Sequence, residues 1–248
     1  MGKGKLAKFA ENETFSCLLQ PDADSVLRGD DPIKGRWNRE MFAERLKGAE
    51  APITVELGCG KGEYTIDLAT RVPDHNYIGV DVKGARLWRG AKTATECCMK
   101  NVAFLRTRIE FINSLFAPDE IDEIWVTFCD PQPKKPNKRL TSPVFLDKYR
   151  KFLKKGGTVH LKTDSRFLHE YTKSVCDANG LRVLSCTDDL YGNRNGAADG
   201  IAPEVYEVQT FYEKMFLSRG CRITYMNFCI DRDGQYLYPE FDAEYWKQ

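Results

Sequence analysis

Short apolar runs alternate with helical patterns along most of this chain. Seven runs rich in β-branched and aromatic residues predict strands, over residues 52–57, 76–80, 102–106, 121–128, 157–162, 181–187 and 222–228. Apolar positions at helical spacing predict helices over residues 63–70, 85–99, 143–153 and 211–219. Because this alternation is typical of βαβ units, we expect an α/β fold with a seven-stranded, mostly parallel sheet and helices on both faces.

The pattern is weaker at the start of the chain and in one late segment. The first 35 or so residues are polar and partly basic, which predicts an N-terminal extension that is mobile unless a ligand or partner orders it. Residues 36–248 are then expected to form one domain, since an apolar content of 42% supplies one substantial core. Residues 189–203 predict a long loop, and such loops are usually functional or disordered.

Composition narrows the class of protein. No stretch has the apolar length of a signal peptide core or a membrane span, so we expect a cytoplasmic protein without a membrane partner. The nine cysteines are odd in number and form no Cys-x-x-Cys pair, which favours reduced thiols over disulfides or a zinc site. The three histidines are isolated in sequence, and we expect no metal.

The net charge of +1 does not by itself indicate a nucleic-acid partner, but its distribution is uneven. Residues 131–155 hold nine Lys or Arg against one acid, whereas residues 109–130 hold six acids and no Lys or Arg. Such segregation can make a basic face on a neutral protein. The alternative is a solvated charge run or a targeting-like cluster.

A glycine-rich loop follows the first predicted strand. Gly58, Gly60 and Gly62 stand at alternate positions between that strand and the next helix. Glycines there let the backbone turn sharply and approach a ligand that any Cβ would touch. The G-x-G-x-G spacing differs from the G-x-G-x-x-G of dinucleotide binders, which favours a ligand without phosphates.

Two acids accompany this loop. Glu56 precedes the glycines, and Asp81 ends the second strand, where a carboxylate can accept both hydroxyls of a ribose. S-adenosylmethionine carries a sulfonium and an ammonium, so acids fit it better than they fit a pyrophosphate. The residues therefore predict an S-adenosylmethionine site, with an exposed strand end or a helix cap as the alternative for each acid.

A second loop, Cys129-Asp130-Pro131-Gln132-Pro133, follows the fourth strand. Its two prolines stiffen the segment and hold Asp130 in place. Ligands of open α/β sheets bind outside the carboxyl ends of the strands, so we expect this loop and the glycine loop to face one crevice. The basic residues that follow are predicted to meet phosphates: Lys134, Lys135, Lys138 and Arg139.

Four motifs, in this order, resemble those of the bacterial tRNA (guanine-N7)-methyltransferases. They are Glu56-Leu57-Gly58-Cys59-Gly60-Lys61-Gly62, Asp130-Pro131-x-Pro133-Lys134-Lys135 with Asn137-Lys138-Arg139-Leu140, Leu161-Lys162-Thr163-Asp164, and Thr210-x-Tyr212-Glu213. The resemblance covers the chain from about residue 50 to its end. It implies a Rossmann-like class I methyltransferase fold and methyl transfer from S-adenosylmethionine to N7 of a guanine in the tRNA variable loop, at position 46. It leaves both a monomer and a homodimer open.

The resemblance also implies site residues. Glu56, Asp81 and Asp130 belong to the cofactor pocket, and Lys134, Asp164, Thr210, Tyr212 and Glu213 to the substrate side. The chain departs from the family pattern at two positions. Gln132 stands where most relatives have tryptophan, and Arg108 aligns where relatives often have an acid. Adenine recognition there would then rely on backbone groups or on Glu110.

The chemistry needs alignment more than a base, because guanine N7 carries a free lone pair and no proton. Asp130 would either stabilise the positive charge that moves onto the purine or hold the guanine through its N–H groups. Asp164 and Glu213 would grip the donor edge of the base, with Thr210 as a hydroxyl partner. As an alternative or an additional role, Asp164 would cap the helix that begins near Arg166, and Thr210 with Glu213 would form a capping box.

Three other functions fit parts of the sequence. One is a methyltransferase for a small molecule or a protein, and another is a catalytically silent RNA-binding protein that keeps the fold as a scaffold. The basic loop speaks against the first and the intact acids Glu56, Asp81 and Asp130 against the second. An NAD-linked oxidoreductase ranks last because of the glycine spacing.

Overall fold

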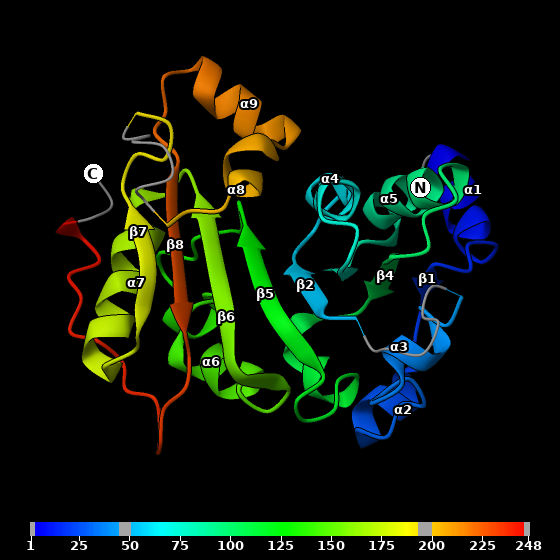
Figure 1. Cartoon of the computed structure of the whole chain (residues 1–248), viewed down its shortest axis with the longest axis horizontal. Helices are drawn as coiled ribbons and strands as arrows, with labels where there is room; N and C mark the ends of the chain where they lie inside the picture. Colours follow the sequence, from blue (N-terminus) through cyan, green and yellow to red (C-terminus); the bar gives the residue numbers. More distant parts are fainter. Residues whose placement is uncertain (1–2, 45–50, 193–199, 246–248) are drawn as a thin grey trace. The chain divides into compact units, whose positions relative to one another are not determined.

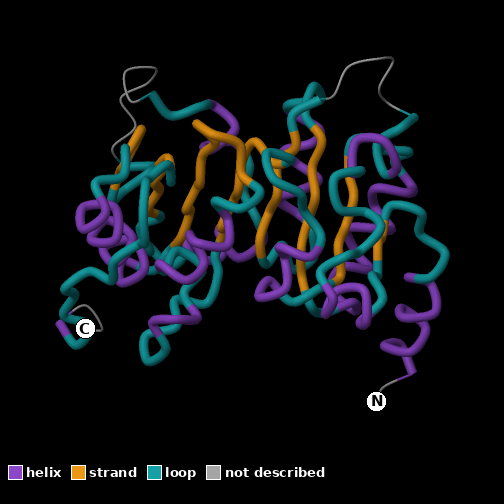
Figure 2. Tube along the Cα trace, turned by 90° about the horizontal axis from the view of Figure 1, so that it is seen from below, coloured by secondary structure: helices purple, strands orange, loops and turns teal. Residues whose placement is uncertain are grey.

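The computed structural model describes residues 3–44, 51–192 and 200–245, and the chain divides into two units, Met1–Asp122 and Glu123–Gln248 (Figure 1). Helices and strands alternate along both units (Figure 2). All seven predicted strands are present within a few residues of their expected ends. An eighth, β1 (Leu18–Leu19), was not predicted, because two residues are too short to show a period.

The strands of the first unit are parallel and lie in the order β1-β4-β3-β2. They are β1, β2 (Ile53–Leu57), β3 (Asn76–Asp81) and β4 (Val102–Arg106). Every residue of β2 and β3 is buried, as the continuous apolar runs predict for a parallel sheet covered on both faces. In register, Leu57 lies opposite Val80 and Asp81 opposite Arg106, so the carboxyl ends of three strands meet at one edge.

Helices α4 (Glu63–Arg71) and α5 (Gly84–Glu96) follow β2 and β3, and both match the predicted helices. Each turns a small apolar face inward, with Leu68 and Leu87 almost fully buried. A short 3₁₀ helix, η1 (Ile109–Ser114), follows β4. These connections place the loops after β2, β3 and β4 at the same edge of the sheet.

Residues 3–40 contain α1 (Lys3–Asn12), β1, α2 (Ala23–Arg28) and α3 (Trp37–Glu40). The Glu11 carboxylate of α1 accepts hydrogen bonds from Trp88 Nε1 at 2.6 Å and Lys92 Nζ at 3.0 Å, both on α5. The Glu120 carboxylate accepts from the backbone N–H groups of Gly35 and Trp37 at 2.9 and 3.2 Å. Described residues of the predicted extension are thus tied to α5, to Glu120 and, through β1, to β4, while the domain boundary at residue 35 stays a prediction.

The second unit holds strands in the order β5-β6-β8-β7, with β8 antiparallel to both of its neighbours. The strands are β5 (Ile121–Thr127), which begins at the end of the first unit, β6 (Leu153–Thr163), β7 (Val183–Thr187) and β8 (Thr224–Cys229). The helices are η2 (Pro136–Lys138), α6 (Pro143–Tyr149), α7 (Arg166–Asn179), α8 (Pro203–Glu207) and α9 (Phe211–Ser218).

Two adjacent predicted boundaries are wrong. The helix expected over residues 143–153 ends at Tyr149, and β6 begins at Leu153 rather than at residue 157. Lys154, Lys155 and Gly156, near the start of the strand, are exposed, so this part shows no apolar pattern. After the buried Leu153, burial resumes only further along β6, and the sequence pattern detects that part alone.

Three further expectations concern the late loop, the cysteines and membrane-spanning helices. Of the loop predicted over residues 189–203, positions 193–199 lie outside the described residues. All nine cysteines are free, as predicted. In the described part of the chain, no helix combines the length and the apolar character needed to cross a bilayer.

Candidate functional site

The glycine loop of the first unit adopts a backbone that side chains rarely allow. Gly58, Gly60 and Gly62 have φ of 77°, 59° and 73°. The N–H groups of Gly58 and Cys59 both donate to Val80 O, at 2.8 and 3.0 Å, which fastens the loop to the end of β3. A Cβ on Gly62 would collide with the Phe104 ring, whereas a Cβ on Gly58 or Gly60 would meet nothing within 4 Å. Gly62 is therefore needed for packing, and Gly58 and Gly60 expose bare backbone to open space.

Asp81 is joined to this loop by a hydrogen bond. Its Oδ2 accepts from the Gly60 N–H at 3.1 Å, and its Oδ1 accepts from the Lys83 N–H at 2.7 Å. The side chain is buried, and these bonds fix the carboxylate at the carboxyl end of β3. A carboxylate held there has the position that ribose hydroxyls need.

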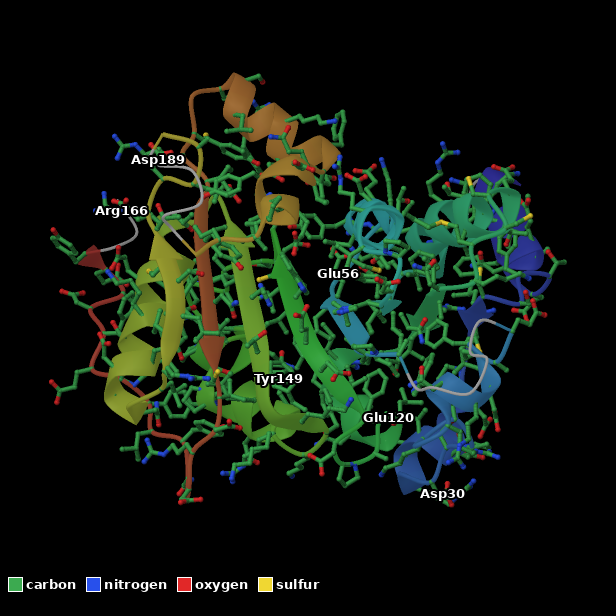
Figure 3. The ribbon with its side chains drawn as sticks, viewed as in Figure 1. Asp30, Glu56, Glu120, Tyr149, Arg166 and Asp189 are labelled. Atoms are coloured by element: carbon green, nitrogen blue, oxygen red, sulfur yellow. The ribbon has the colours of Figure 1, made fainter. Side chains whose placement is uncertain are left out.

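Glu56 supplies the second acid, from β2 (Figure 3). It is buried, and its Oε2 accepts a hydrogen bond from the Thr65 hydroxyl of α4. Burial raises the pKa of the intervening Cys59 thiol, and the charges of Glu56 and Asp81 raise it further. Both carboxylates thus act on one buried thiol, which is protonated at neutral pH and unsuited to nucleophilic attack.

These residues fit S-adenosylmethionine. Two negative charges suit its sulfonium and ammonium, and the bare backbone at Gly58 and Gly60 leaves room that a Cβ would fill. Val82, directly after Asp81, is 52% exposed although apolar, and no sequence argument singled it out. The signal that could have found Val82 in the sequence is an apolar residue next to a strand-end acid, because such a side chain offers a surface for a flat ring of the ligand.

Arg108 and Glu110 follow β4, which lies beside β3, so they stand at the same edge of the sheet as Asp81. Arg108 is exposed, and its Nη2 lies 3.7 Å from Glu110 Oε1. Arg106, the last residue of β4, stands opposite Asp81 in the sheet register. The two predicted adenine-side residues are therefore close to each other and follow the strand that neighbours Asp81.

The loop of residues 129–133 in the second unit, called the reaction loop below, carries Asp130. Its start is anchored by the Phe128 N–H, which donates to Lys162 O on β6 at 2.9 Å, and the Phe128 ring stacks on Phe216 of α9 at 6.3 Å. The Asp130 side chain is exposed, and its Oδ1 accepts from the Gln132 N–H at 3.0 Å. Phe128 and Gln132 have positive φ, 46° and 48°, so the acid lies between two residues of unusual backbone conformation.

Asp164 lies in the same neighbourhood as Asp130. Burial raises the pKa of the Cys129 thiol to about 12, and the charges of both aspartates add to that rise. Asp164 is half-buried, and burial raises its own pKa as well. It does not cap α7: the cap is Ser165, whose hydroxyl accepts from the Leu168 N–H at 3.2 Å. The alternative role as a helix cap is therefore wrong for Asp164.

Thr210 caps α9, because its hydroxyl accepts from the Glu213 N–H at 3.1 Å. The Glu213 carboxylate does not complete the capping box. It is fully buried, 2.8 Å from Lys162 Nζ, and accepts a hydrogen bond from the Tyr191 hydroxyl at 2.6 Å. Tyr212, next to it, is 53% exposed. The structure thus brings Glu213 to Lys162, and a grip on guanine by Glu213 stays a prediction.

Three of the four basic residues predicted to meet phosphates are exposed: Lys134, Lys135 and Lys138. Arg139 differs from that expectation, because only 3% of its surface is exposed. Its guanidinium instead faces the reaction loop and two aromatic rings. The sequence shows the charge of such a residue but not its depth.

Comparison with known proteins finds relatives over nearly the whole chain. A family described as "Putative methyltransferase" matches residues 50–224. The chain is 43% identical over 244 residues to the tRNA (guanine-N(7)-)-methyltransferase of Bacteroides fragilis, covering 98% of this chain and 92% of that protein. It is 47% identical over 237 residues to the protein of the same name from Porphyromonas gingivalis, covering 94% and 92%.

Solved structures share the fold at low identity. A 16S rRNA methyltransferase, KamB, matches with a TM-score of 0.54 and 16% identity, covering 75% of this chain and 91% of that one. A SAM-dependent methyltransferase from Aquifex aeolicus matches with a TM-score of 0.50 and 15% identity, covering 85% and 99%. These matches confirm the Rossmann-like methyltransferase fold, and the relatives above identify the family within it. The chain belongs to the tRNA (guanine-N(7)-)-methyltransferase family.

Proposed function

We propose that this protein transfers the methyl group of S-adenosylmethionine to N7 of a guanine in the variable loop of tRNA, in the cytoplasm. The observation that carries the proposal is the pair of buried acids, Glu56 and Asp81, beside a glycine loop whose backbone is bare at Gly58 and Gly60. The relatives named above, similar over nearly the whole chain, are tRNA (guanine-N(7)-)-methyltransferases, which supports the same substrate here.

The residues of the first unit bind and orient S-adenosylmethionine. Bound there, S-adenosylmethionine supplies a methyl group on a sulfonium. Asp81 is fixed by two backbone N–H groups and has lone pairs left for ribose hydroxyls. Glu56 adds negative charge for a cationic ligand, and Val82 offers it an apolar face.

The residues of the second unit act on the RNA. Asp130 Oδ1 is held by the Gln132 N–H, and its second oxygen remains for the guanine, either to accept from its N–H groups or to stabilise positive charge on the ring. Lys134, Lys135 and Lys138 are exposed and give affinity for phosphates without reading sequence. Asp164, Thr210 and Tyr212 complete the proposed substrate side.

The test uses unmodified tRNA and labelled S-adenosylmethionine. Wild-type protein should label the RNA, and mass-spectrometric mapping should place the methyl group on guanine N7. Asp130→Ala should abolish labelling, and Asp130→Asn should lower turnover by on the order of 100-fold or more, since a fixed carboxylate is lost. Asp74→Asn, an exposed acid in a turn of the first unit, serves as the matched control.

Three results would contradict the proposal. Near-normal turnover of a folded Asp130→Ala variant removes Asp130 from the reaction. Activity that survives RNase treatment of the substrate indicates a small molecule or a protein as the acceptor. Absence of S-adenosylmethionine binding by calorimetry would leave only a silent RNA-binding protein.

A further inference from the structure

Arg139 is buried although it stands in a basic segment. Its guanidinium lies over the rings of Phe167 and Tyr171 of α7, with its central carbon 4.7 and 4.2 Å from the ring centroids. Only 3% of its surface is exposed, whereas the neighbouring Lys138 is exposed. An arginine held in this way has little reach toward a phosphate, so its charge must be used inside the unit.

The donors of Arg139 point at the reaction loop. Nε donates to the carbonyl of Gln132 at 3.2 Å, and Nη2 donates to the carbonyl of Pro133 at 3.0 Å. One planar group thus holds two successive carbonyls. Pro131 and Pro133 have no N–H, so the loop cannot be held by a regular backbone ladder. The side chain of Arg139, which lies outside the reaction loop, holds the loop instead through these two carbonyls.

The residue between the two prolines has a strained backbone. Gln132 has φ of 48°, a left-handed conformation that non-glycine residues seldom adopt. In this conformation its carbonyl accepts from Arg139, and its N–H donates to Asp130 Oδ1 at 3.0 Å. A single peptide segment therefore links the guanidinium to the carboxylate that the proposed reaction uses.

We propose that Arg139 is a positioning residue, which keeps Gln132 in the left-handed conformation and thereby fixes the Asp130 carboxylate for the guanine. The inference rests on the proposed function for the role of Asp130. It assigns the connection to the backbone of Gln132 and not to its side chain. It also separates Arg139 from Lys134, Lys135 and Lys138, which are exposed and are proposed to meet phosphates.

The experiment compares Arg139→Lys, which keeps the charge and loses the planar fork, with Arg139→Gln, which loses the charge. Lys138→Met is the neighbouring control, and it should raise the KM for tRNA and reduce the salt slope of binding by about 0.9. Both Arg139 variants should instead lower kcat by on the order of 10- to 100-fold, because a misplaced group costs about that much. Their KM for tRNA and salt slope should stay at the wild-type values.

A second readout does not need activity. Hydrogen exchange of the segment 128–133 should be faster in a folded Arg139→Lys variant than in wild type or Lys138→Met. Unchanged exchange overturns the inference, as does an Arg139→Lys variant with wild-type kcat beside an Arg139→Gln variant of raised KM, the signature of a phosphate contact. If wild-type protein methylates no tRNA, the proposed function fails, while faster exchange still demonstrates the clamp.

Discussion

Backbone conformation at single residues decides how the acid of the reaction loop is presented. Phe128 and Gln132 both have positive φ, and they bracket Asp130 at a distance of two residues on either side. Such conformations cost on the order of 1–3 kcal/mol and persist only where surrounding contacts fix them. Here those contacts are Lys162 O and Phe216 for Phe128, and for Gln132 the Arg139 guanidinium and the Lys135 N–H, which donates to Gln132 O at 3.1 Å.

Replacement of Gln132 should therefore follow backbone preference. Gln132→Asn keeps a residue that tolerates φ of 48°, whereas Gln132→Val places a β-branched side chain in a conformation it avoids. We expect the valine variant to lose several-fold more turnover than the asparagine variant, with equal affinity for S-adenosylmethionine by calorimetry. Equal turnover of the two variants would show that φ at this position is unimportant.

The acids and glycines of the first unit could be placed from the sequence because a residue at a strand end faces the edge of the sheet. The sequence pattern places Asp81 with the glycine loop, and the structure joins Asp81 to Gly60. The pattern does not show the burial of Arg139 or of Glu213. Burial of a charged residue depends on partners distant in sequence, such as Tyr171 and Lys162, and no local pattern reports it.

At the scale of elements, one ion pair connects a strand with two helices. Lys162 of β6 donates to the carbonyls of Val205 in α8 and of Val208 just after it, at 2.7 and 2.9 Å, and pairs with Glu213 of α9 at 2.8 Å. Both charged side chains are fully buried. Burial lowers the pKa of Lys162, and the charge of Glu213 opposes that shift.

Removing both partners together should cost less than the sum of the two single removals. Glu213→Gln or Lys162→Met leaves a buried charge without its counter-charge, and we expect each to lower the free energy of unfolding by about 3 kcal/mol. In the double variant Lys162→Met with Glu213→Gln, the loss of unfolding free energy should fall well short of the sum of the two single losses. Urea unfolding of the four proteins measures this cycle, and additive losses would rule out the coupling.

The elements themselves were predictable where burial is continuous. β2 and β3 are buried along their whole length, and their apolar runs gave correct bounds within a residue or two. β1 pairs with β4 over two residues only, Leu18 with Phe104 and Leu19 with Leu105, too few for a pattern. Lys154, Lys155 and Gly156 near the start of β6 are exposed, and the sequence pattern misses them for the same physical reason: periodicity records burial.

At the scale of the whole molecule, acid should weaken the fold through buried neutral histidines. His160 of β6 stacks on Trp125, with ring centroids 4.1 Å apart and planes at 7°. Its Nδ1 lies 2.8 Å from the Tyr225 hydroxyl and its Nε2 3.0 Å from the Thr158 hydroxyl. Burial lowers the pKa of His160 to about 4, although the charge of Glu123 opposes the shift. The same cause lowers the pKa of His169 to about 4.

The unfolded chain binds protons at these histidines near pH 6.5, and the folded chain binds them only near pH 4. The free energy of unfolding therefore falls as the pH drops from 6.5 to 4, and above pH 6.5 the two histidines hardly affect it. At pH 5 each histidine should cost about 2 kcal/mol of unfolding free energy relative to pH 7. His160→Gln removes one titrating group, so its stability at pH 7 should be lower, through lost stacking, but its decline toward pH 5 should be about half as steep. Urea unfolding at both pH values measures the slopes, and nuclear magnetic resonance follows the imidazole directly. A His160→Gln protein as acid-sensitive as wild type, or protonation of His160 in the folded protein above pH 6, would place the acid response elsewhere.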